Sequence, residues 1–139
     1  MAYTIAMSNE KGGVAKTTST LSLGAALAEL NYRVLLIDLD PQANLSLALG
    51  MELEEADITS ADILIESAAI KTAIRKSEIA GLDIVPSSFR IENAEQFLPM
   101  RNQYLTTLRA ALEADPLPYD YILLDCPPAL GAITLNALS

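Results

Sequence analysis

Histidine is absent from this 139-residue chain, and Cys126 is its single cysteine. Without histidine the chain has no His-based acid–base pair, no Ser-His triad and none of the usual zinc sites. One cysteine cannot form a disulfide within the chain, and Cys126 is expected to pack as a small buried hydrophobic side chain. Any catalysis must therefore come from carboxylates, lysines, backbone amides and a hard metal ion.

Long hydrophobic runs and basic segments are also missing. The apolar runs at 34–37 and 122–124 each end at an aspartate, far short of the roughly 20 residues that a membrane span needs. The first four residues carry no basic side chain and do not resemble a secretory signal, so a cytoplasmic location without membrane contact is expected. The net charge is −9, with only 9 lysines and arginines, so the chain has no electrostatic footprint for DNA by itself.

The length and composition indicate one compact domain without repeats or linkers. Of the 139 residues, 51% are hydrophobic and 19% are charged, which is typical of a soluble fold. Short apolar runs predict four strands, at 3–8, 33–39, 82–86 and 119–125. Helices are expected at 16–31, from 59 to about 76, at 91–98, at 103–114 and from 133 onward.

The spacing of leucines supports the first helix. Leu23, Leu27 and Leu30 stand at positions i, i+4 and i+7 and are predicted to share one helical face. The segment 44–50 is open to two interpretations, because its leucines alternate as in a strand, yet it also fits a helical turn closed by Gly50.

Capping residues support the second helix. Thr59 with Asp62 resembles a capping box that opens a helix. Near its expected end, Lys71, Arg75 and Lys76 are spaced to share one helical face. Three basic residues in an acidic chain are expected to form a solvated face in preference to a nucleic-acid patch.

Alternating strands and helices, with strand runs apolar enough to be buried on both faces, predict an α/β fold. The sheet is expected to be parallel, with helices on both faces. In such sheets, ligands bind beyond the carboxyl ends of the strands. The segment 9–18 follows the first strand, Asp38 and Asp40 lie at the end of the second, and Asp125 ends the fourth. Three strand ends therefore converge on one predicted site.

The segment 9–18 reads N-E-K-G-G-V-A-K-T-T and has the properties of a phosphate-binding loop. Gly12 and Gly13 let the backbone approach a phosphate closely, and the helix that follows adds its partial positive charge. Lys16 is expected to reach the β- and γ-phosphates, and the Thr17 hydroxyl to ligate Mg²⁺. A glycine turn that merely joins strand to helix would not explain two lysines in this position.

The strict P-loop pattern G-x-x-x-x-G-K-[ST] fails here, because Glu10 and Ala15 stand at its outer glycines. The segment instead matches K-G-G-x-x-K-T and resembles the deviant Walker A loop of ParA/Soj-type P-loop ATPases, in the ParA/MinD superfamily. The resemblance implies that Lys11 is a signature lysine that reaches the nucleotide of a partner subunit across a dimer. The residues it implies for Mg-ATP binding are Lys11, Gly12, Gly13, Val14, Ala15, Lys16, Thr17 and Thr18.

Asp38 and Asp40 follow a buried strand and, by the period of two, share one side of it. Buried carboxylates are costly unless they face water or a cation, although one of the pair could cap the turn after the strand. The stretch D-L-D-P-Q resembles the family's D-x-D-P-Q segment, which implies that Asp40 positions the attacking water and Asp38 supports the metal.

The apolar run that ends at Asp125, before two prolines, resembles the family's second nucleotide-binding motif. The resemblance implies that Asp125 would hold Mg²⁺ through water. The implied catalytic residues are Lys11, Lys16 and Asp40, and the implied metal residues are Thr17, Asp38 and Asp125.

The resemblance runs from Tyr3 to the last residue but covers only about half of a family domain, so residues 1–139 are expected to form the N-terminal portion of a nucleotide-binding domain. It implies an ATP-hydrolysing switch that forms an ATP-dependent homodimer and positions plasmid or chromosome DNA or other cargo. A ParB-like adaptor, and non-specific DNA bound by the part of the domain beyond this sequence, are the implied partners, with nucleoid association in the ATP state. Two alternatives remain: a MinD-like membrane-cycling ATPase, and a nucleotide-binding module without turnover. The stretch Asp40-Pro41-Gln42 favours the ParA type.

Overall fold

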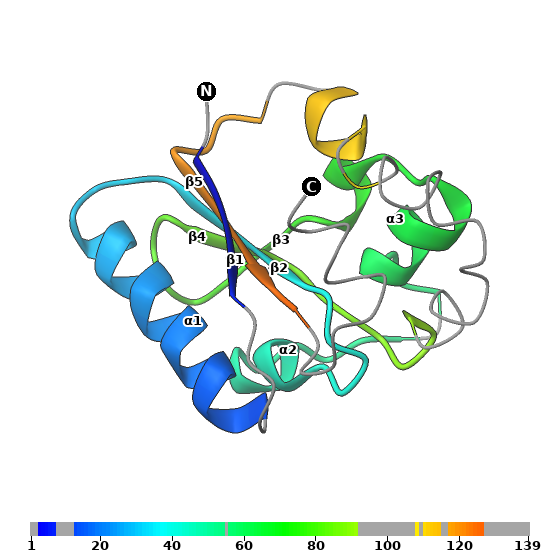
Figure 1. The fold of residues 1–139 in the computed structure, drawn as a ribbon, viewed down its shortest axis with the longest axis horizontal. Helices are drawn as coiled ribbons and strands as arrows, with labels where there is room; N and C mark the ends of the chain where they lie inside the picture. Colours follow the sequence, from blue (N-terminus) through cyan, green and yellow to red (C-terminus); the bar gives the residue numbers. More distant parts are fainter. Residues whose placement is uncertain are drawn as a thin grey trace.

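The computed structural model describes residues 3–7, 13–54, 56–91, 108, 110–114 and 117–126, with the side chains of 13–16 left out. Within these ranges the chain forms one five-stranded sheet in the order β1-β5-β2-β4-β3 (Figure 1). Leu108 and residues 110–114 are also helical. The elements are β1 (Tyr3–Met7), α1 (Gly13–Glu29), β2 (Val34–Asp38), α2 (Asn44–Ala48), α3 (Ser60–Glu66), the 3₁₀ helix η1 (Ile70–Ala73), β3 (Arg75–Lys76), β4 (Leu82–Val85) and β5 (Tyr121–Asp125).

The sheet is parallel apart from its edge strand β3, which pairs antiparallel with β4. In the register of β1 with β5, Met7 is the partner of Asp125, and in the register of β2 with β5, Asp38 is the partner of Asp125. The strands β1, β5 and β2 therefore end at the same level. The predicted parallel α/β sheet is confirmed, and the four strands lie within two residues of their expected bounds over the described positions.

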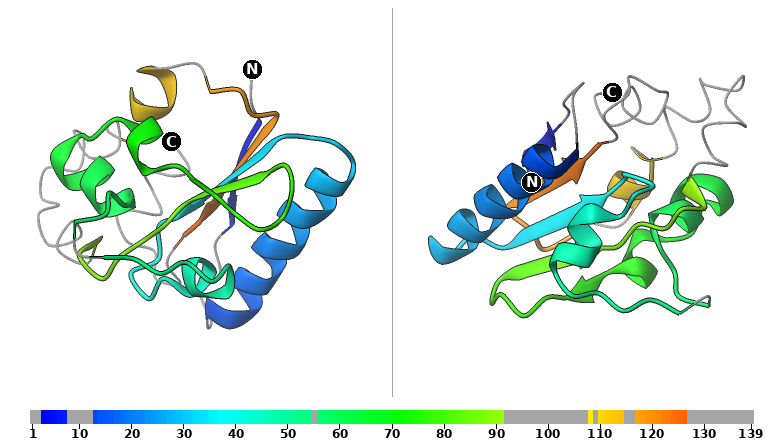
Figure 2. Two further views of the ribbon diagram at one scale, coloured as in Figure 1. Left: turned by 180° about the vertical axis from the view of Figure 1, so that it is seen from behind. Right: turned by 90° about the horizontal axis from the view of Figure 1, so that it is seen from below.

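Helices cover both faces of the sheet, as predicted (Figures 1 and 2). Successive strand residues point to opposite faces, and the two buried clusters separate accordingly. On one face Leu36, Ile84 and Leu123 pack with Ala28 of α1. On the other face the α3 side chains pack against a second set of strand residues, Leu35, Ile37, Val85, Ile122 and Leu124.

Helix α1 lies close to the sheet at Gly24. A Cβ atom at this position would stand 3.0 Å from Leu36 Cδ2 and 3.2 Å from Leu82 Cδ1. Leu23 and Leu27 pack on the same cluster as expected. The prediction for Leu30 is wrong: it is 66% exposed, because α1 ends at Glu29 and the backbone turns away.

The phosphate-loop segment continues into α1 earlier than expected. The helix begins at Gly13, whereas the sequence predicted a helix from residue 16. Glycine and alanine adopt helical backbone angles at the start of a helix without steric cost, and no strong capping residue marks the boundary in the sequence. The segment 44–50, left open by the sequence, contains the short helix α2, and Gly50 follows it with a positive φ of 70°.

The capping box of the second predicted helix is confirmed. The amide of Thr59 donates to Asp62 Oδ2 at 2.8 Å, and the amide of Ala61 donates to Thr59 Oγ1 at 3.2 Å. The predicted end of this helix, near residue 76, is wrong. Helix α3 ends at Glu66, because Ser67 adopts a left-handed backbone (φ 55°) and the amide of Ala68 donates back to the carbonyl of Asp62.

The early end of α3 also removes the predicted basic helical face. Lys71 lies in η1, whereas Arg75 and Lys76 are consecutive residues of β3 and point to opposite sides of that strand. Arg75 forms an ion pair with Asp57 at 3.2 Å.

The remaining predicted helices fall largely on residues outside the described ranges. This applies to 91–98 apart from Ile91, to 133–139, and to 103–107 and residue 109 of the predicted helix 103–114. Among the described residues, no helix is both long enough and apolar enough to cross a membrane.

Candidate functional site

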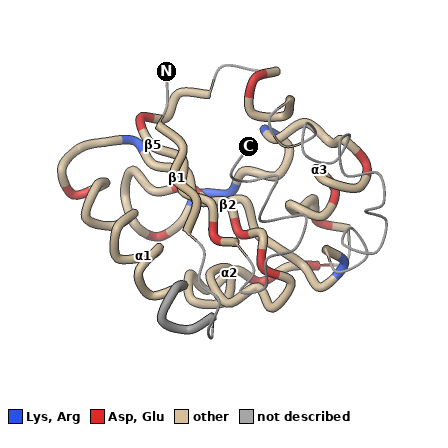
Figure 3. The backbone as a smooth tube through the Cα atoms, in the orientation of Figure 1, with Lys and Arg blue, Asp and Glu red and all other residues tan. Residues whose placement is uncertain are grey.

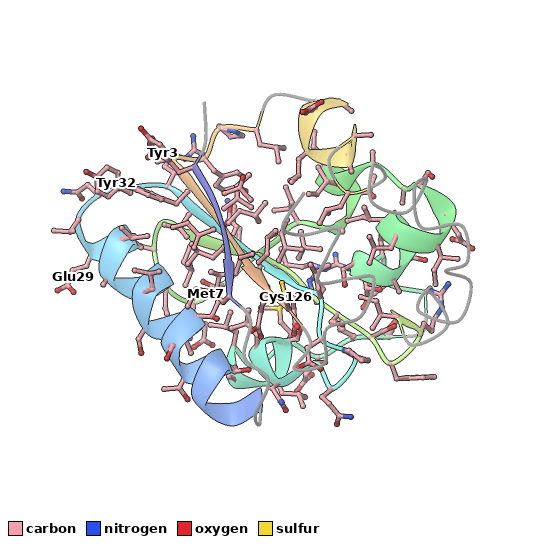
Figure 4. All side chains as sticks on the ribbon, in the orientation of Figure 1. Tyr3, Met7, Glu29, Tyr32 and Cys126 are labelled. Carbon is pink, nitrogen blue, oxygen red and sulfur yellow. The ribbon has the colours of Figure 1, made fainter. Side chains whose placement is uncertain are left out.

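The site is built where β1, β5 and β2 end side by side. The pairing continues one residue past Asp125: the amide of Cys126 donates to the Met7 carbonyl at 3.0 Å, and the amide of Leu39 donates to the Asp125 carbonyl at 2.9 Å. Figure 4 shows Met7 and Cys126 at this edge, with Tyr3 and Tyr32 at the opposite end of the sheet. In Figure 3 acidic positions gather where β2 and β5 end.

The start of α1 faces the same edge. The first turn of a helix carries backbone N–H groups without acceptors inside the helix, and it bears a partial positive charge. Since α1 begins at Gly13, these donors fall within the predicted phosphate loop. Lys11 and Gly12 lie outside the described residues, as do the side chains of Val14, Ala15 and Lys16, so their roles stay predictions.

Asp125 has no solvent exposure and accepts hydrogen bonds from two threonines of α1. Thr17 Oγ1 donates to Asp125 Oδ2 at 3.3 Å, and Thr20 Oγ1 approaches Asp125 Oδ1 at 3.5 Å. The structure thus brings together Thr17 and Asp125, two of the three residues predicted at the metal. Thr18, predicted to bind nucleotide, is solvent-exposed. Thr20 was not among the predicted residues, although it stands three positions after Thr17 and therefore on the same helical face.

Asp38 is also fully buried, and both of its carboxylate oxygens accept hydrogen bonds from the protein. The Asp40 amide donates to Oδ1 at 3.1 Å, whereas the amide and hydroxyl of Ser46 donate to Oδ2 at 3.0 and 2.7 Å. Burial raises the pKa of Asp38 to about 7; the Ser46 and Asp40 hydrogen bonds oppose this rise, and the neighbouring Asp125 charge adds to it. A cation at this edge would favour the charged form of Asp38.

Asp40 lies two residues past the end of β2 and is 1% exposed. Its Oδ1 accepts the amide of Gln42 at 2.9 Å, so it does cap the turn after the strand, as the alternative interpretation held. The Asp40 carbonyl accepts the hydroxyl of Ser87 at 2.7 Å. Asp38 and Asp40 thus both order the loop after β2 and lie at the edge that Asp125 shares.

Sequence reasoning missed three buried serines at this edge: Ser46, Ser60 and Ser87. Ser60 Oγ donates to the Asp38 carbonyl at 2.7 Å, and the amide of Ser87 donates to Ser46 Oγ at 3.0 Å. Ser87 alone carried a usable signal, because it follows Pro86 directly after an apolar strand, in the same position relative to its strand that Asp40 has relative to β2.

The donor set fits a magnesium ion that is held partly by a ligand. Among the described residues, no three Asp, Glu or Cys side chains converge closely enough to hold a metal ion by themselves. Mg²⁺ typically takes one or two carboxylates, retains water, and completes its shell with substrate phosphates. One hydroxyl and one carboxylate, Thr17 and Asp125, agree with that pattern.

Comparisons with known proteins bear on the same region. The AAA domain family AAA_31 matches residues 2–139. The chain is 42% identical over 139 residues to the sporulation initiation inhibitor protein Soj of Bacillus subtilis, covering 100% of this chain and 55% of Soj. It is 42% identical over 137 residues to the chromosome partitioning protein ParA of Caulobacter vibrioides, covering 97% of this chain and 51% of ParA.

A solved structure shows the same fold. Cobyrinic acid a,c-diamide synthase from Mycobacterium smegmatis, with a bound ATP analog and magnesium, superposes with a TM-score of 0.91 at 37% identity, covering 99% of this chain and 56% of the synthase. The chain thus spans about half the length of the curated relatives it matches. The predicted similarity to ParA/Soj-type P-loop ATPases is confirmed.

Proposed function

We propose that this chain, which belongs to the AAA_31 family of AAA domains, binds Mg-ATP at the carboxyl-end edge of its sheet as part of a ParA-type ATPase. The observation that carries the proposal is the contact of Thr17 with Asp125, 3.3 Å from Oγ1 to Oδ2. It joins the helix that follows the phosphate loop to the end of a buried parallel strand, which is where P-loop proteins place their metal-binding hydroxyl and carboxylate.

The proposed roles of the residues come from the resemblance to the family's motifs, and the places of Thr17, Asp38 and Asp125 at this edge support them. Lys16 supplies a positive charge to the terminal phosphates, and Thr17 and Asp125 hold Mg²⁺, with Asp125 acting through water. The metal ion, when bound, neutralises charge on the phosphates. Asp40 orients the attacking water, and Asp38 supports the metal side of the site while ordering the loop that carries Asp40.

In the proposed function, ATP binding and hydrolysis switch the protein between a dimer and a monomer. Residues 1–139 form the N-terminal portion of the nucleotide-binding domain, and Lys11 reaches the nucleotide of a second subunit in an ATP-dependent homodimer. A ParB-like adaptor and non-specific DNA are the proposed partners. Because this chain carries a net charge of −9, the DNA-binding surface is assigned to residues beyond this sequence. The names of Soj and ParA support this context.

Two measurements on the full-length protein test the proposal: ATP affinity in the presence of Mg²⁺, and phosphate release with and without DNA. Mg-ATP binding with phosphate release stimulated by DNA supports a partition ATPase. Binding without release favours a nucleotide-binding module. If phosphate release requires an organic acid substrate and its rate does not change with DNA, the result favours instead a synthase like the Mycobacterium smegmatis relative.

A further inference from the structure

The main chain of Asp40 is held on both sides by buried side chains. Its amide donates to Asp38 Oδ1 at 3.1 Å, and its carbonyl accepts Ser87 Oγ at 2.7 Å. Asp40 lies past the last residue of β2, so these two contacts fix it where the strand pairing has stopped.

Both contacts lead to one hydroxyl group, that of Ser46 in α2. Ser46 Oγ donates to Asp38 Oδ2 at 2.7 Å and accepts the amide of Ser87 at 3.0 Å. A hydroxyl has one proton to donate and two lone pairs, so the direction of each bond is defined. Ser46 and Ser87 are 41 residues apart in sequence, and both are 1% exposed.

This hydrogen-bond network fixes the position of the Asp40 main chain more tightly than apolar packing alone would. In a buried polar network, removal of one member leaves the others without a partner, and they shift to find new ones. A shift of the Asp40 main chain moves its carboxylate with it. A displacement of about 1 Å at a reacting group can cost on the order of 10²-fold in rate.

We infer that Ser46 and Ser87 are positioning residues for ATP hydrolysis, which hold the backbone of Asp40 so that its carboxylate meets the attacking water. The inference rests on the proposed function, since it requires Asp40 to act on that water. Neither serine contacts the nucleotide in this assignment, so both act on turnover and not on affinity.

The test compares single variants of the full-length protein by phosphate release, ATP affinity and thermal unfolding. Ser46→Ala and Ser87→Ala are expected to lower kcat about tenfold or more while ATP affinity stays within about twofold. Ser46→Thr keeps the hydroxyl and is expected to restore most of the rate. It also remains informative if an alanine variant does not fold.

Ser60→Ala is the matched control. Ser60 is equally buried, and its hydroxyl also makes a 2.7 Å hydrogen bond, but to the carbonyl of Asp38. Asp38 is the last residue of β2 and is still held by strand pairing with Asp125, whereas Asp40 lies beyond the strand. The loss of the same group at Ser60 is expected to lower the melting temperature as the other alanine variants do, with kcat unchanged.

Asp40→Ala separates failure of this inference from failure of the proposed function. If Asp40→Ala does not turn over while Ser46→Ala and Ser87→Ala match the Ser60→Ala rate, the positioning role is wrong and the proposed function stands. A parallel loss of ATP affinity in the two serine variants also overturns the positioning role. If Asp40→Ala hydrolyses ATP normally, or the unaltered protein hydrolyses none, the proposed function fails and the inference with it.

Discussion

Two buried carboxylates in this fold accept hydrogen bonds in similar ways and yet differ in charge environment. Asp62, at the start of α3, accepts the Thr59 amide at 2.8 Å and forms an ion pair with Arg90 at 3.0 Å. Asp38, at the end of β2, accepts two amides and a hydroxyl, all of them neutral donors. Burial by itself favours a higher pKa at both carboxyls. At Asp62 the Thr59 hydrogen bond and Arg90 outweigh burial, so the pKa is lowered. At Asp38 burial prevails, and the pKa is raised to about 7.

The difference separates a structural carboxylate from one at a candidate site. The start of α3 carries its own cation, so its charge is balanced within the fold. At the strand edge Asp38 pairs in register with Asp125, and a second acid, Asp40, lies two residues away. Like charges collected in a buried place destabilise a fold unless a cation or a ligand compensates them, and such clusters are typical of functional sites. The comparison therefore predicts that the edge depends on Lys16, Mg²⁺ and nucleotide, and that the α3 start does not.

Lys16→Ala tests this dependence and has the largest expected effect. It removes the positive charge proposed for both terminal phosphates, at a cost of about 3 kcal/mol or more, so that ATP binding falls below detection in a titration. Arg90→Ala is the control, because it removes a cation from the α3 start and is expected to leave ATP affinity unchanged. Equal ATP affinity in the Lys16 variant and the unaltered protein would show that the edge is not a nucleotide site.

Lys11→Ala in the full-length protein is expected to retain ATP binding and to lose ATP-dependent dimerisation and most hydrolysis. A cation supplied by a partner subunit can contribute about 10³-fold or more to the rate. Sedimentation with ATP and phosphate release measure the two losses. In a mixture of Lys11→Ala with Lys16→Ala, each mixed dimer holds at most one competent site, whose Lys11 comes from the subunit that cannot bind ATP. Normal hydrolysis by a monomeric Lys11→Ala protein would contradict the shared site.

Asp40→Ala is expected to spare ATP affinity and to trap the ATP-bound state. In the proposed function Asp40 acts on the attacking water and not on the ground-state phosphates, so kcat should fall while ATP affinity holds. Single-turnover measurements with a binding titration separate the two quantities. An equal loss of affinity and rate would make Asp40 a primary metal ligand and would place it beside Asp125 in function.

The sequence predicted the strand edge well because each signal there is local. An apolar run that ends in aspartate marks both the strand and the acid at its end, and parallel pairing then brings the ends together, as Asp38 and Asp125 show. The start of α3 was similarly predictable, because the Thr59–Asp62 capping box is formed by four consecutive residues.

The errors arise where backbone turns or tertiary partners decide the structure. Asn31 and Ser67 adopt left-handed backbones, with φ of 71° and 55°, at the ends of α1 and α3. Asn31 is a residue type that commonly ends a helix, and the predicted bound at 31 lies two residues past the observed end of α1 at Glu29, so Leu30 was assigned to a helical face that ends before it. Ser67 is neither glycine nor asparagine, so no residue type in the sequence marked the end of α3. The serine network could not be predicted, because Ser46 and Ser87 meet only after α2 and the end of β4 have packed together.

The smallest expected effect concerns Asp62, the carboxylate that the comparison with Asp38 assigns a structural role. Asp62→Asn keeps the shape of the capping box but removes the charge that faces Arg90 and the helix start, so it is expected to cost about 0.5–1 kcal/mol of unfolding free energy at pH 7. Because the pKa of Asp62 is lowered in the folded state, the charged carboxylate binds fewer protons when folded than when unfolded. Its contribution is therefore fully present above the unfolded pKa of about 4 and is lost as the pH falls through the lower folded pKa.

Urea unfolding of the unaltered protein and of Asp62→Asn from pH 7 down to pH 2.5 measures this loss. The difference between their unfolding free energies should shrink below about pH 4, with ATP affinity at pH 7 equal in the two. A difference that stayed constant down to the lowest pH would mean that the Asp62 charge contributes nothing, and the contrast with Asp38 would then rest on burial alone.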